Sequence, residues 1–364
     1  MKVVQEGSLK NPSFHGIIIK DPHCNWGFAN RIRHNHEDDL DFKWGFLQDY
    51  MNQNNIQDLI ITGDLVDSND EKKWSFKQYY KNKEKLLKFK QSKTFWSIAG
   101  NHDMLNGFEG VNETPFGEFV RENVIEHLTN KPICLGENSW IYGIDYSKYK
   151  DVTKNKLNGI SLNHSNVNGL IIAVIHAHVT PNEVGCTEWT YNELLENFPG
   201  IDVFVCGHYH GGFPVQIFLK KIKQPDGTFI DDPNNHVVMI NPWSFQRVVR
   251  DYYNEMDIHI PEFVEIKTEN INDEWYLEFK NIQVPVKSYE ETFKPKVVEL
   301  LKVTRKEHFK FFETVNFDDI KVGANDEEIL VQFAEADDLD KSIIIKAFDK
   351  VLPLISPTHI VSIP

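Results

Sequence analysis

Short apolar runs alternate with longer amphipathic stretches through the first two thirds of the chain. Five of these runs are four to six residues long and rich in β-branched or aromatic residues, which is typical of buried β-strands: Gly16–Lys20, Leu59–Thr62, Thr94–Ala99, Leu170–Ile175 and Val203–Cys206. Between them, apolar residues recur at helical spacing from Leu40 to Met51 and from Tyr79 to Phe89. This alternation predicts an α/β sheet protein.

The pattern changes twice beyond Gly211. We expect two further strand pairs, Val215–Lys221 with Val237–Ile240 and Phe263–Lys267 with Trp275–Ile282. After Pro285 the expected elements are a helix, a strand and a second helix, at Val297–Val303, Glu328–Phe333 and Leu339–Leu352. We therefore predict two domains, residues 1–287 and a small C-terminal α/β domain at 288–364.

Composition and charge exclude several classes of protein. The 364 residues are 41% hydrophobic and 26% charged, which is ordinary for a globular protein and excludes a disordered or fibrous chain. The formal net charge is −15, the wrong sign for holding nucleic acid by bulk charge. A polyanionic substrate would have to be met by metal ions or by a confined basic patch.

The spacing of the cysteines and the length of the apolar runs indicate the cellular compartment of the protein. The four cysteines are far apart and form no C-x-x-C pair, so neither a disulfide framework nor a zinc knuckle is expected. The apolar runs reach about six residues, whereas a membrane helix needs about 20. We expect a soluble cytoplasmic protein with no membrane partner.

Each of the five early strands is followed by side chains that can bind metal. The chain continues from them, in order, into Asp21-Pro22-His23, Gly63-Asp64-Leu65-Val66-Asp67, Gly100-Asn101-His102-Asp103, His176-Ala177-His178 and Gly207-His208-Tyr209-His210. Ligands collect beyond the carboxyl ends of the strands in an α/β sheet, so we expect these groups to meet at one rim.

The residue types indicate the chemistry. Asp, Asn and His without Cys suit divalent manganese, iron or zinc, and one carboxylate can bridge two cations about 3.5–4 Å apart that clamp a phosphoryl group. Each motif alone also has a structural interpretation, because Asn-His-Asp could cap a helix and Gly-His-x-His could be a surface turn. Their joint occurrence, each after a strand, favours a dinuclear metal site.

The order D-x-H, G-D-x-x-D, G-N-H-D, H and G-H-x-H resembles the calcineurin-like metallophosphoesterase superfamily. The resemblance implies a β-sandwich flanked by helices, with the C-terminal α/β domain as a cap. It implies two divalent ions, manganese first, with magnesium, iron or zinc as alternatives. One ion would be held by Asp21, His23, Asp64 and His210, and the other by Asp64, Asn101, His176 and His208.

The remaining residues of these motifs receive other roles by the same resemblance. His102 would donate a proton or hydrogen bond to the leaving group, and Asp103 would orient its imidazole. We interpret His178 as a neighbour of the ligands, Asp67 as a loop or capping residue, and Lys20 as the end of the first strand.

Within the superfamily, the chain is most similar to the SbcD-type DNA-repair nucleases. Asn241-Pro242-Trp243-Ser244-Phe245-Gln246-Arg247 is similar to their N/Y-P-G-S-x-x-R segment, with Trp243 in place of the glycine as a packed aromatic or a base-stacking platform. The resemblance implies a DNA exonuclease and endonuclease of repair or recombination with an SbcC-like ATPase partner, and it leaves a homodimer open. Arg31, Arg33 and Arg247 are candidate nucleic-acid contacts.

Two alternatives remain. The same site could serve a phosphatase or phosphodiesterase that acts on nucleotides, other small phosphoesters or phosphoproteins. A non-enzymatic scaffold could keep the fold without hydrolysis, but the presence of every predicted ligand argues against it. We therefore predict an enzyme, a metal-dependent phosphoesterase.

Overall fold

The computed structural model describes residues 1–24, 26, 36–66, 75–136, 138–164, 169–183, 187–224, 226, 228–245 and 261–285. The predicted C-terminal domain, its two helices and strand, and the boundary between residues 287 and 288 lie outside these ranges and stay predictions.

The chain forms two compact units. The first comprises Met1–Asn25, Trp44–Gln246 and Ile260–Val284, and the second comprises Trp26–Lys43, Arg247–His259 and Pro285–Pro364. Within the described part of the second unit, an ion pair of 2.8 Å joins Lys43 to Asp39 on the helix α1 (His36–Gln53). All strands described below belong to the first unit.

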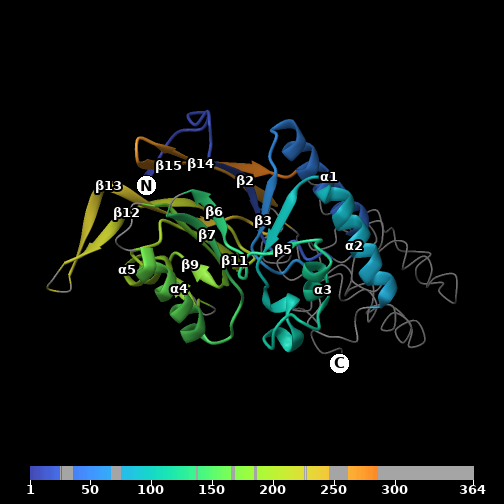
Figure 1. Ribbon diagram of the computed structural model, residues 1–364. Helices are drawn as coiled ribbons and strands as arrows, with labels where there is room; N and C mark the ends of the chain where they lie inside the picture. The colour runs from blue at the N-terminus through green and yellow to red at the C-terminus, as the bar shows by residue number, and fades with distance from the viewer. Residues whose placement is uncertain are drawn as a thin grey trace, which may run out of the picture. The chain divides into compact units, whose positions relative to one another are not determined.

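A seven-stranded mixed sheet forms one layer of the first unit (Figure 1). Three of the early strands pair in parallel in it, and a fourth, short strand extends them. On the opposite edge of these strands, an antiparallel hairpin around residue 270 pairs with the first of them and continues the sheet. The order is β1 (Lys2–Val3), β15 (Glu274–Gln283), β14 (Glu262–Ile271), β2 (Phe14–Ile19), β3 (Asp58–Ile61), β4 (Thr94–Ser97) and β5 (Glu126–His127).

A six-stranded sheet forms the second layer. Its order is β12 (Phe213–Lys223), β13 (Phe229–Asn241), β11 (Val203–His208), β8 (Ile171–Ala177), β7 (Ser139–Ile144) and β6 (Ile133–Gly136). The two-residue strands β9 (Val179–Thr180) and β10 (Trp189–Thr190) pair beside it.

The main core lies between the two sheets. Alternate residues of a strand point to opposite faces, so Ile172 and Val174 of β8 face the first sheet, while Ile171 and Ala173 face away from it. Both sets are buried, which explains why this strand appears in the sequence as a continuous apolar run.

Helices cover the outer faces of the sandwich (Figure 1). The helices α4 (Lys150–His164) and α5 (Tyr191–Asn197) pack on the six-stranded sheet through Leu157, Leu194 and Leu195. On the seven-stranded sheet, Trp44 of α1 contacts Phe95 of β4 and Phe89 of α2 (Phe76–Lys90). The short helix α3 (Pro115–Arg121) follows β4, with Thr114 as its N-cap.

The predicted fold class, an α/β sandwich flanked by helices, is therefore correct, and all nine strands expected before residue 285 are confirmed. One expectation needs correction. The five metal-motif strands do not belong to a single sheet, because β2, β3 and β4 lie in one layer and β8 and β11 in the other. Their carboxyl ends still meet, at the rim where the two layers adjoin.

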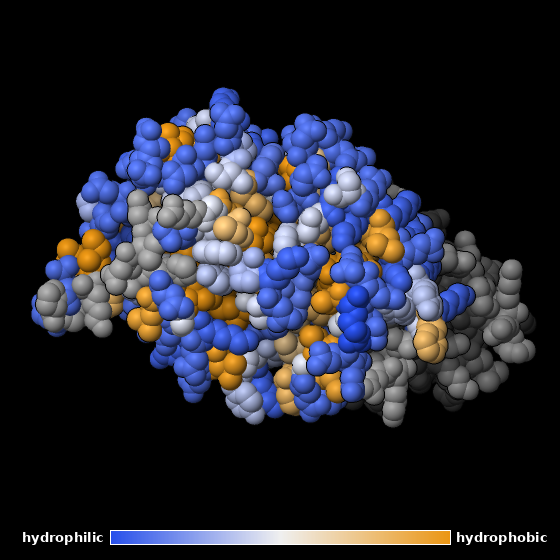
Figure 2. Space-filling model, in the orientation of Figure 1, coloured by the Kyte–Doolittle hydropathy of each residue, from blue (hydrophilic) through white to orange (hydrophobic). Residues whose placement is uncertain are grey.

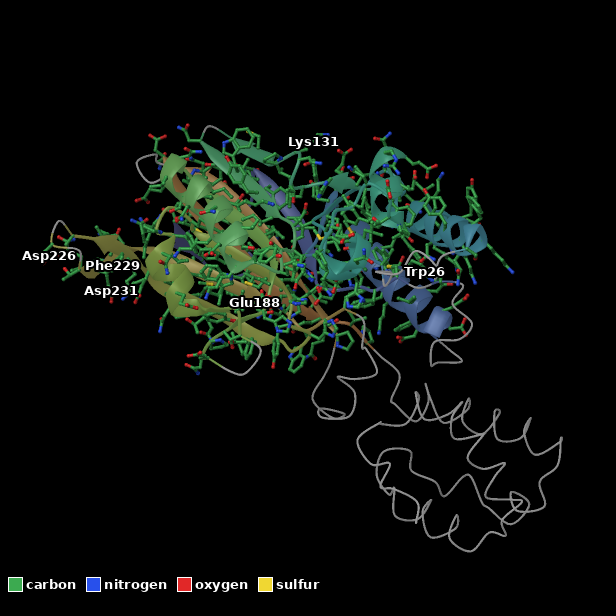
Figure 3. The ribbon with its side chains drawn as sticks, turned by 90° about the horizontal axis from the view of Figure 1, so that it is seen from below. Trp26, Lys131, Glu188, Asp226, Phe229 and Asp231 are labelled. Atoms are coloured by element: carbon green, nitrogen blue, oxygen red, sulfur yellow. The ribbon has the colours of Figure 1, made fainter. Side chains whose placement is uncertain are left out.

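The β12–β13 hairpin extends away from the rest of the sandwich. Asp226, Phe229 and Asp231 lie at its outer end (Figure 3). Hydrophobic side chains are visible on this arm among mostly hydrophilic surface (Figure 2), and the exposed apolar residues there are Ile217, Leu219, Ile222 and Ile230.

Within the described ranges, every helix is too short or too polar to cross a lipid bilayer.

A buried charged network on β14 supports a pH-dependent prediction. Glu265 is 6% exposed and accepts hydrogen bonds from His15 Nε2 at 2.7 Å and Tyr50 Oη at 2.6 Å. Burial alone would raise the pKa of Glu265, but these hydrogen bonds and the charge of Lys267 lower it to about 2. The folded state therefore gains stability from ionised Glu265 above pH 4.5 and loses that gain as the pH falls towards 2.

Glu265→Gln should lower the free energy of unfolding at pH 7 by about 1.5–3 kcal/mol, the range for a hydrogen bond to a charged group. The difference from wild type should shrink between pH 4.5 and 2, as measured by urea unfolding across that range. Glu274→Gln, which disrupts an exposed ion pair with Lys2, is the control and should have a much smaller effect. An equal effect of both substitutions at every pH would contradict the prediction.

Candidate metal centre

The carboxyl ends of the five motif strands bring carboxylate and imidazole groups together. Two groups of side chains have ligand atoms within 4.8 Å of one another, and the groups share Asp64: His23, Asp64 and His210, and Asp64, His176 and His208. The residues come from the ends of β2, β3, β8 and β11, so both sheets contribute.

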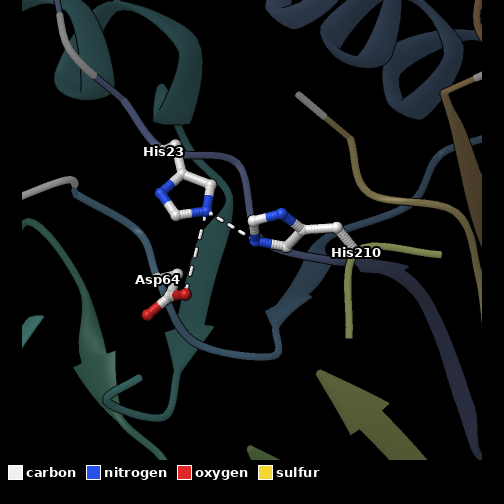
Figure 4. Close-up of side chains that lie close together, drawn as sticks. All are labelled: His23, Asp64 and His210. Atoms are coloured by element: carbon white, nitrogen blue, oxygen red, sulfur yellow. Dashed lines mark hydrogen bonds and ion pairs between the residues drawn. The ribbon is translucent and has the colours of Figure 1, made fainter. Parts of the chain in front are cut away.

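In the first group, three ligand atoms converge (Figure 4). His23 Nε2 lies 3.2 Å from His210 Nε2 and 3.7 Å from Asp64 Oδ2. Asp21 approaches the same imidazole, with its Oδ2 3.8 Å from His210 Nε2. These four residues are those that the resemblance assigned to one ion, and the structure brings them together.

In the second group, His176 is the central residue. Its Nδ1 lies 2.7 Å from the backbone oxygen of Thr62, so Nδ1 carries the proton and donates it. The other nitrogen, Nε2, then faces Asn101 Oδ1 at 3.2 Å and Asp64 Oδ1 at 3.4 Å. The ring of His208 lies 4.8 Å from that of His176. Asn101 thus lies with the second predicted ligand set.

The donor set fits divalent cations. Ring nitrogens and carboxylate or amide oxygens face one another in both groups, and such an arrangement of acceptors is satisfied when a cation lies between them. Asp64 Oδ2 is fully buried and accepts no hydrogen bond within the described part of the chain, whereas Asp64 Oδ1 accepts one from His102 N at 3.0 Å. Oδ2 faces His23 of the first group and Oδ1 faces His176 of the second, so this carboxylate would suit a ligand shared by two cations.

The charged side chains of the cluster shift one another's pKa values. Burial alone would raise the pKa of Asp64, but His176, His102 and His23 together hold it well below its usual value. Burial would in turn lower the pKa of His176, but the carboxylates of Asp64 and Asp21 raise it to about 9. Without metal, His176 therefore favours a second proton, on Nε2, and cation binding has to displace this proton.

The backbone is strained at the candidate ligands. Four of them have positive φ angles, 45° at Asp21, 40° at His23, 48° at Asp64 and 78° at His208. This region is uncommon for residues other than glycine and is tolerated where the surrounding structure enforces it. The sharp turns let each chain leave its strand and direct its side chain into the rim.

The Asn101–Asp103 turn places its two predicted catalytic residues differently. The ring of His102 lies 5.0 Å from that of His23, beside the first group. We expected Asp103 to orient this imidazole, but its carboxylate instead accepts hydrogen bonds from the backbone nitrogens of Leu65, Val66 and Gly100 at 3.2, 2.9 and 2.9 Å. The one-turn 3₁₀ helix directs Asp103 towards the backbone, where it joins the loops after β3 and β4. Burial and the charge of Asp64 raise the pKa of Asp103 to about 7.

His178 lies next to the ligands, in neither group. Its ring is 4.0 Å from that of His208, and its backbone nitrogen donates to Glu188 Oε2 at 3.1 Å. Burial, then the charge of His176, lowers the pKa of His178 to about 4. Arg31, Arg33, Arg247 and Asp67 lie outside the described residues.

Two contributors to this rim were missed in the sequence. Strand β7 ends in Asp145-Tyr146, and the ring of Tyr146 lies 5.1 Å from that of His208. Asp145 Oδ1 accepts from Ala99 N at 2.8 Å, just before the Asn101–Asp103 turn. The signal that could have found it is a strand-like run followed by a carboxylate, as at Asp21 and Asp64. The other missed contributor is Lys20, whose contacts are described below.

Comparison with known proteins agrees with this geometry. Residues 19–212, more than half of the chain, match the family of calcineurin-like phosphoesterases. The chain belongs to this family. Calcineurin-like phosphoesterases are hydrolases that depend on a dinuclear metal centre, and this chain has candidate ligand groups for such a centre at the rim.

Three solved structures show more distant similarity. A dimetal phosphatase from Danio rerio has 10% identity and a TM-score of 0.45, over 76% of this chain and all of that one. A candidate 5′-nucleotidase from Staphylococcus aureus, in complex with α-ketoglutarate, has 12% identity and a TM-score of 0.44, over 76% of this chain and 55% of that one. GAP50, the anchor in the inner membrane complex of Plasmodium, has 8% identity and a TM-score of 0.39, over 76% and 89%. No curated protein matches the chain.

Proposed function

We propose that this calcineurin-like phosphoesterase is a phosphodiester hydrolase that cleaves DNA, of the SbcD type. The observation that carries the proposal is the pair of ligand groups sharing Asp64, with His102 beside them. When bound, two divalent ions supply Lewis-acid activation of water and of the phosphoryl oxygens. We propose Asp21, His23, Asp64, Asn101, His176, His208 and His210 as their ligands.

The chain's own residues contribute positioning and proton transfer. His102 lies next to the first ligand group, and its imidazole can donate a proton or hydrogen bond to the departing oxygen of a phosphoester. Asp103 holds the loops after β3 and β4 through three backbone amides, so it maintains the position of His102 relative to Asp64.

Residues 241–245, the described part of the segment that resembles SbcD-type nucleases, lie against the candidate ligands. Ser244 Oγ donates to the backbone oxygen of Asp21 at 3.2 Å, and Ser244 N donates to that of His210 at 3.3 Å. Trp243, which stands where those nucleases have glycine, packs over Gly212, because a Cβ there would lie 2.6 Å from Trp243 Cδ1. These contacts support the proposal, since they give the subfamily segment a position at the site.

One observation favours the alternative, a phosphatase or phosphodiesterase acting on small phosphoesters or phosphoproteins. The net charge of −15 opposes unaided binding to DNA. An SbcC-like ATPase could supply the missing positive charge, and this partner, a homodimer and the preference for manganese stay predictions.

The first experiment incubates the purified chain and Mn²⁺ with end-labelled linear double-stranded DNA. Bis(p-nitrophenyl) phosphate and p-nitrophenyl phosphate, a diester and a monoester, are tested in parallel. We expect Mn²⁺-dependent shortening of DNA and faster cleavage of the diester than of the monoester. Intact DNA with rapid turnover of the monoester would overturn the nuclease proposal and support the small-substrate alternative.

His102→Ala should lower kcat by about 10²-fold, because general acid catalysis contributes at least this much. The variant should still bind two Mn²⁺ ions, since His102 is in neither ligand group. Single-turnover rates and calorimetric metal titration measure the two quantities. A diester with a p-nitrophenol leaving group needs little protonation and should lose less than DNA; an equal loss on both substrates would argue against a proton-donating role.

A further inference from the structure

Lys20 is a buried cation at the rim. It follows β2, directly precedes Asp21, and its side chain is fully buried. Its ammonium lies within hydrogen-bond distance of three acceptors, Tyr209 O at 2.6 Å, Gly211 O at 2.8 Å and Asn241 Oδ1 at 2.7 Å. An ammonium has three N–H donors and accepts nothing, so this arrangement uses its full capacity.

The three acceptors belong to segments that form the candidate metal centre. Tyr209 and Gly211 flank His210, so the ammonium holds the backbone on both sides of this ligand. Asn241 ends β13, and its Nδ2 donates to the backbone oxygen of Val179 at 2.9 Å. The lysine thus connects the end of β2 in one sheet with two segments of the other sheet.

Asp21 completes the attachment from the next position in the chain. Its Oδ2 accepts from the backbone nitrogen of His208 at 3.1 Å. Two side chains of opposite charge therefore hold the end of β11 and the loop after it. The carboxylate of Asp21 accepts from one backbone amide, and the ammonium of Lys20 donates to two backbone carbonyls. His208 and His210, the two candidate ligands of that loop, lie between these attachments.

We infer that Lys20 is a positioning residue for the metal centre, whose buried ammonium fixes the loop carrying His208 and His210. On charge alone, a buried cation beside the centre repels divalent ions. Its removal would then tighten metal binding. The two hydrogen bonds to the ligand loop, with the third to Asn241, predict the opposite, because misplaced ligands bind metal more weakly.

The sign of the change in metal affinity therefore tests the inference. The inference rests on one part of the proposed function, namely that the centre binds metal. Lys20→Met keeps the length and apolar body of the side chain and removes the charge and the three donors. In the full chain, we expect the Kd for Mn²⁺ to rise by about 10–100-fold, the range for residues that orient metal ligands. Isothermal titration calorimetry measures it directly. An unchanged or lower Kd would overturn the positioning role.

Lys93→Met is the matched control. Lys93 is also buried and its Nζ donates to Asn52 Oδ1, but it precedes β4, at the end opposite to Asn101. This variant should lose thermal stability and keep the wild-type Kd for Mn²⁺. An equal loss of metal affinity in both variants would show a general cost of removing a buried lysine and would overturn the inference.

A rescue experiment separates the ammonium from the rest of the side chain. Lys20→Ala removes the equivalent of propylammonium, so added propylammonium should restore Mn²⁺ affinity, and 1-propanol should not. Restoration by both compounds, or by neither, would contradict a role for the charged hydrogen-bond donor. If the wild-type chain binds no Mn²⁺, the proposed function fails. If the wild type binds two ions and the Lys20 variant binds them equally well, only the positioning role of Lys20 fails.

Discussion

Asp64→Asn will lower the rate of phosphodiester cleavage by at least about 10³-fold, the equivalent of several kcal/mol of charge stabilisation by metal. Asp64 is the one residue shared by the two ligand groups. Asparagine keeps the shape of the side chain but loses the negative charge, and it offers one oxygen where the carboxylate offers two. One candidate ion site loses its ligand atom and the other keeps only a neutral amide oxygen, so metal titration should find at most one weakly bound Mn²⁺.

Asp202→Asn is the matched control for this prediction. Asp202 is also a buried carboxylate, and it accepts from Ile171 N at 2.9 Å and from Lys220 Nζ at 2.7 Å. It precedes β11, at the end of the strand opposite to His208. The control should bind two Mn²⁺ ions with wild-type affinity. Retention of two tightly bound ions and of the cleavage rate in Asp64→Asn would refute the bridging role.

The strands and their motifs could be predicted because their signals are local. Strand β8 is buried on both faces, so its residues form a continuous apolar run that ends at His176. The same holds for β3 before Asp64 and for β11 before His208. Since the carboxyl end of each strand lies at the rim, the position of each motif after a strand was enough to predict that the candidate ligands lie close together.

The division of the strands between two sheets could not be predicted from these signals. It depends on pairing between distant segments, such as β14 with β2, which a pattern of apolar residues does not specify. The backbone partners of Asp103 could not be predicted for a related reason. The direction of its side chain depends on the one-turn helix at Asn101–Asp103 and on the amides of Leu65 and Val66, which come from another loop.

The burial of Lys20 could not be predicted from the sequence either. A lysine after three isoleucines has the sequence signal of a strand end at the surface, because lysine is almost never fully buried. Its burial depends on three acceptors supplied by residues about 190 and 220 positions later in the chain.

The second large effect is expected from a residue without a side chain. Gly100 precedes the Asn101–Asp103 turn, with an ordinary φ angle of −87°, so alanine is acceptable there on backbone grounds. However, there is no room for a methyl group at this position. A Cβ at this position would lie 2.7 Å from His176 Cε1 and closer still to Asp64 Oδ1 and the backbone nitrogen of Asp64. Real Cβ atoms essentially never approach so closely, so Asp64 or His176 would have to move.

Gly100→Ala should therefore lower the cleavage rate by about 10³-fold, since displacement of about 1 Å already costs about 10²-fold and here two candidate ligands are in contact with the new methyl group. It should also weaken Mn²⁺ binding in calorimetric titration, although every predicted ligand is present. Gly159→Ala is the control, because a Cβ at Gly159, inside α4, has no neighbour within 4 Å. That variant should gain about 0.5–1 kcal/mol in the free energy of unfolding, the usual benefit of alanine over glycine within a helix, with metal binding and rate unchanged. A Gly100→Ala chain that binds two Mn²⁺ ions as tightly as wild type would show that Asp64 and His176 can shift without loss, and the close packing of the glycine would then have no role in forming the centre.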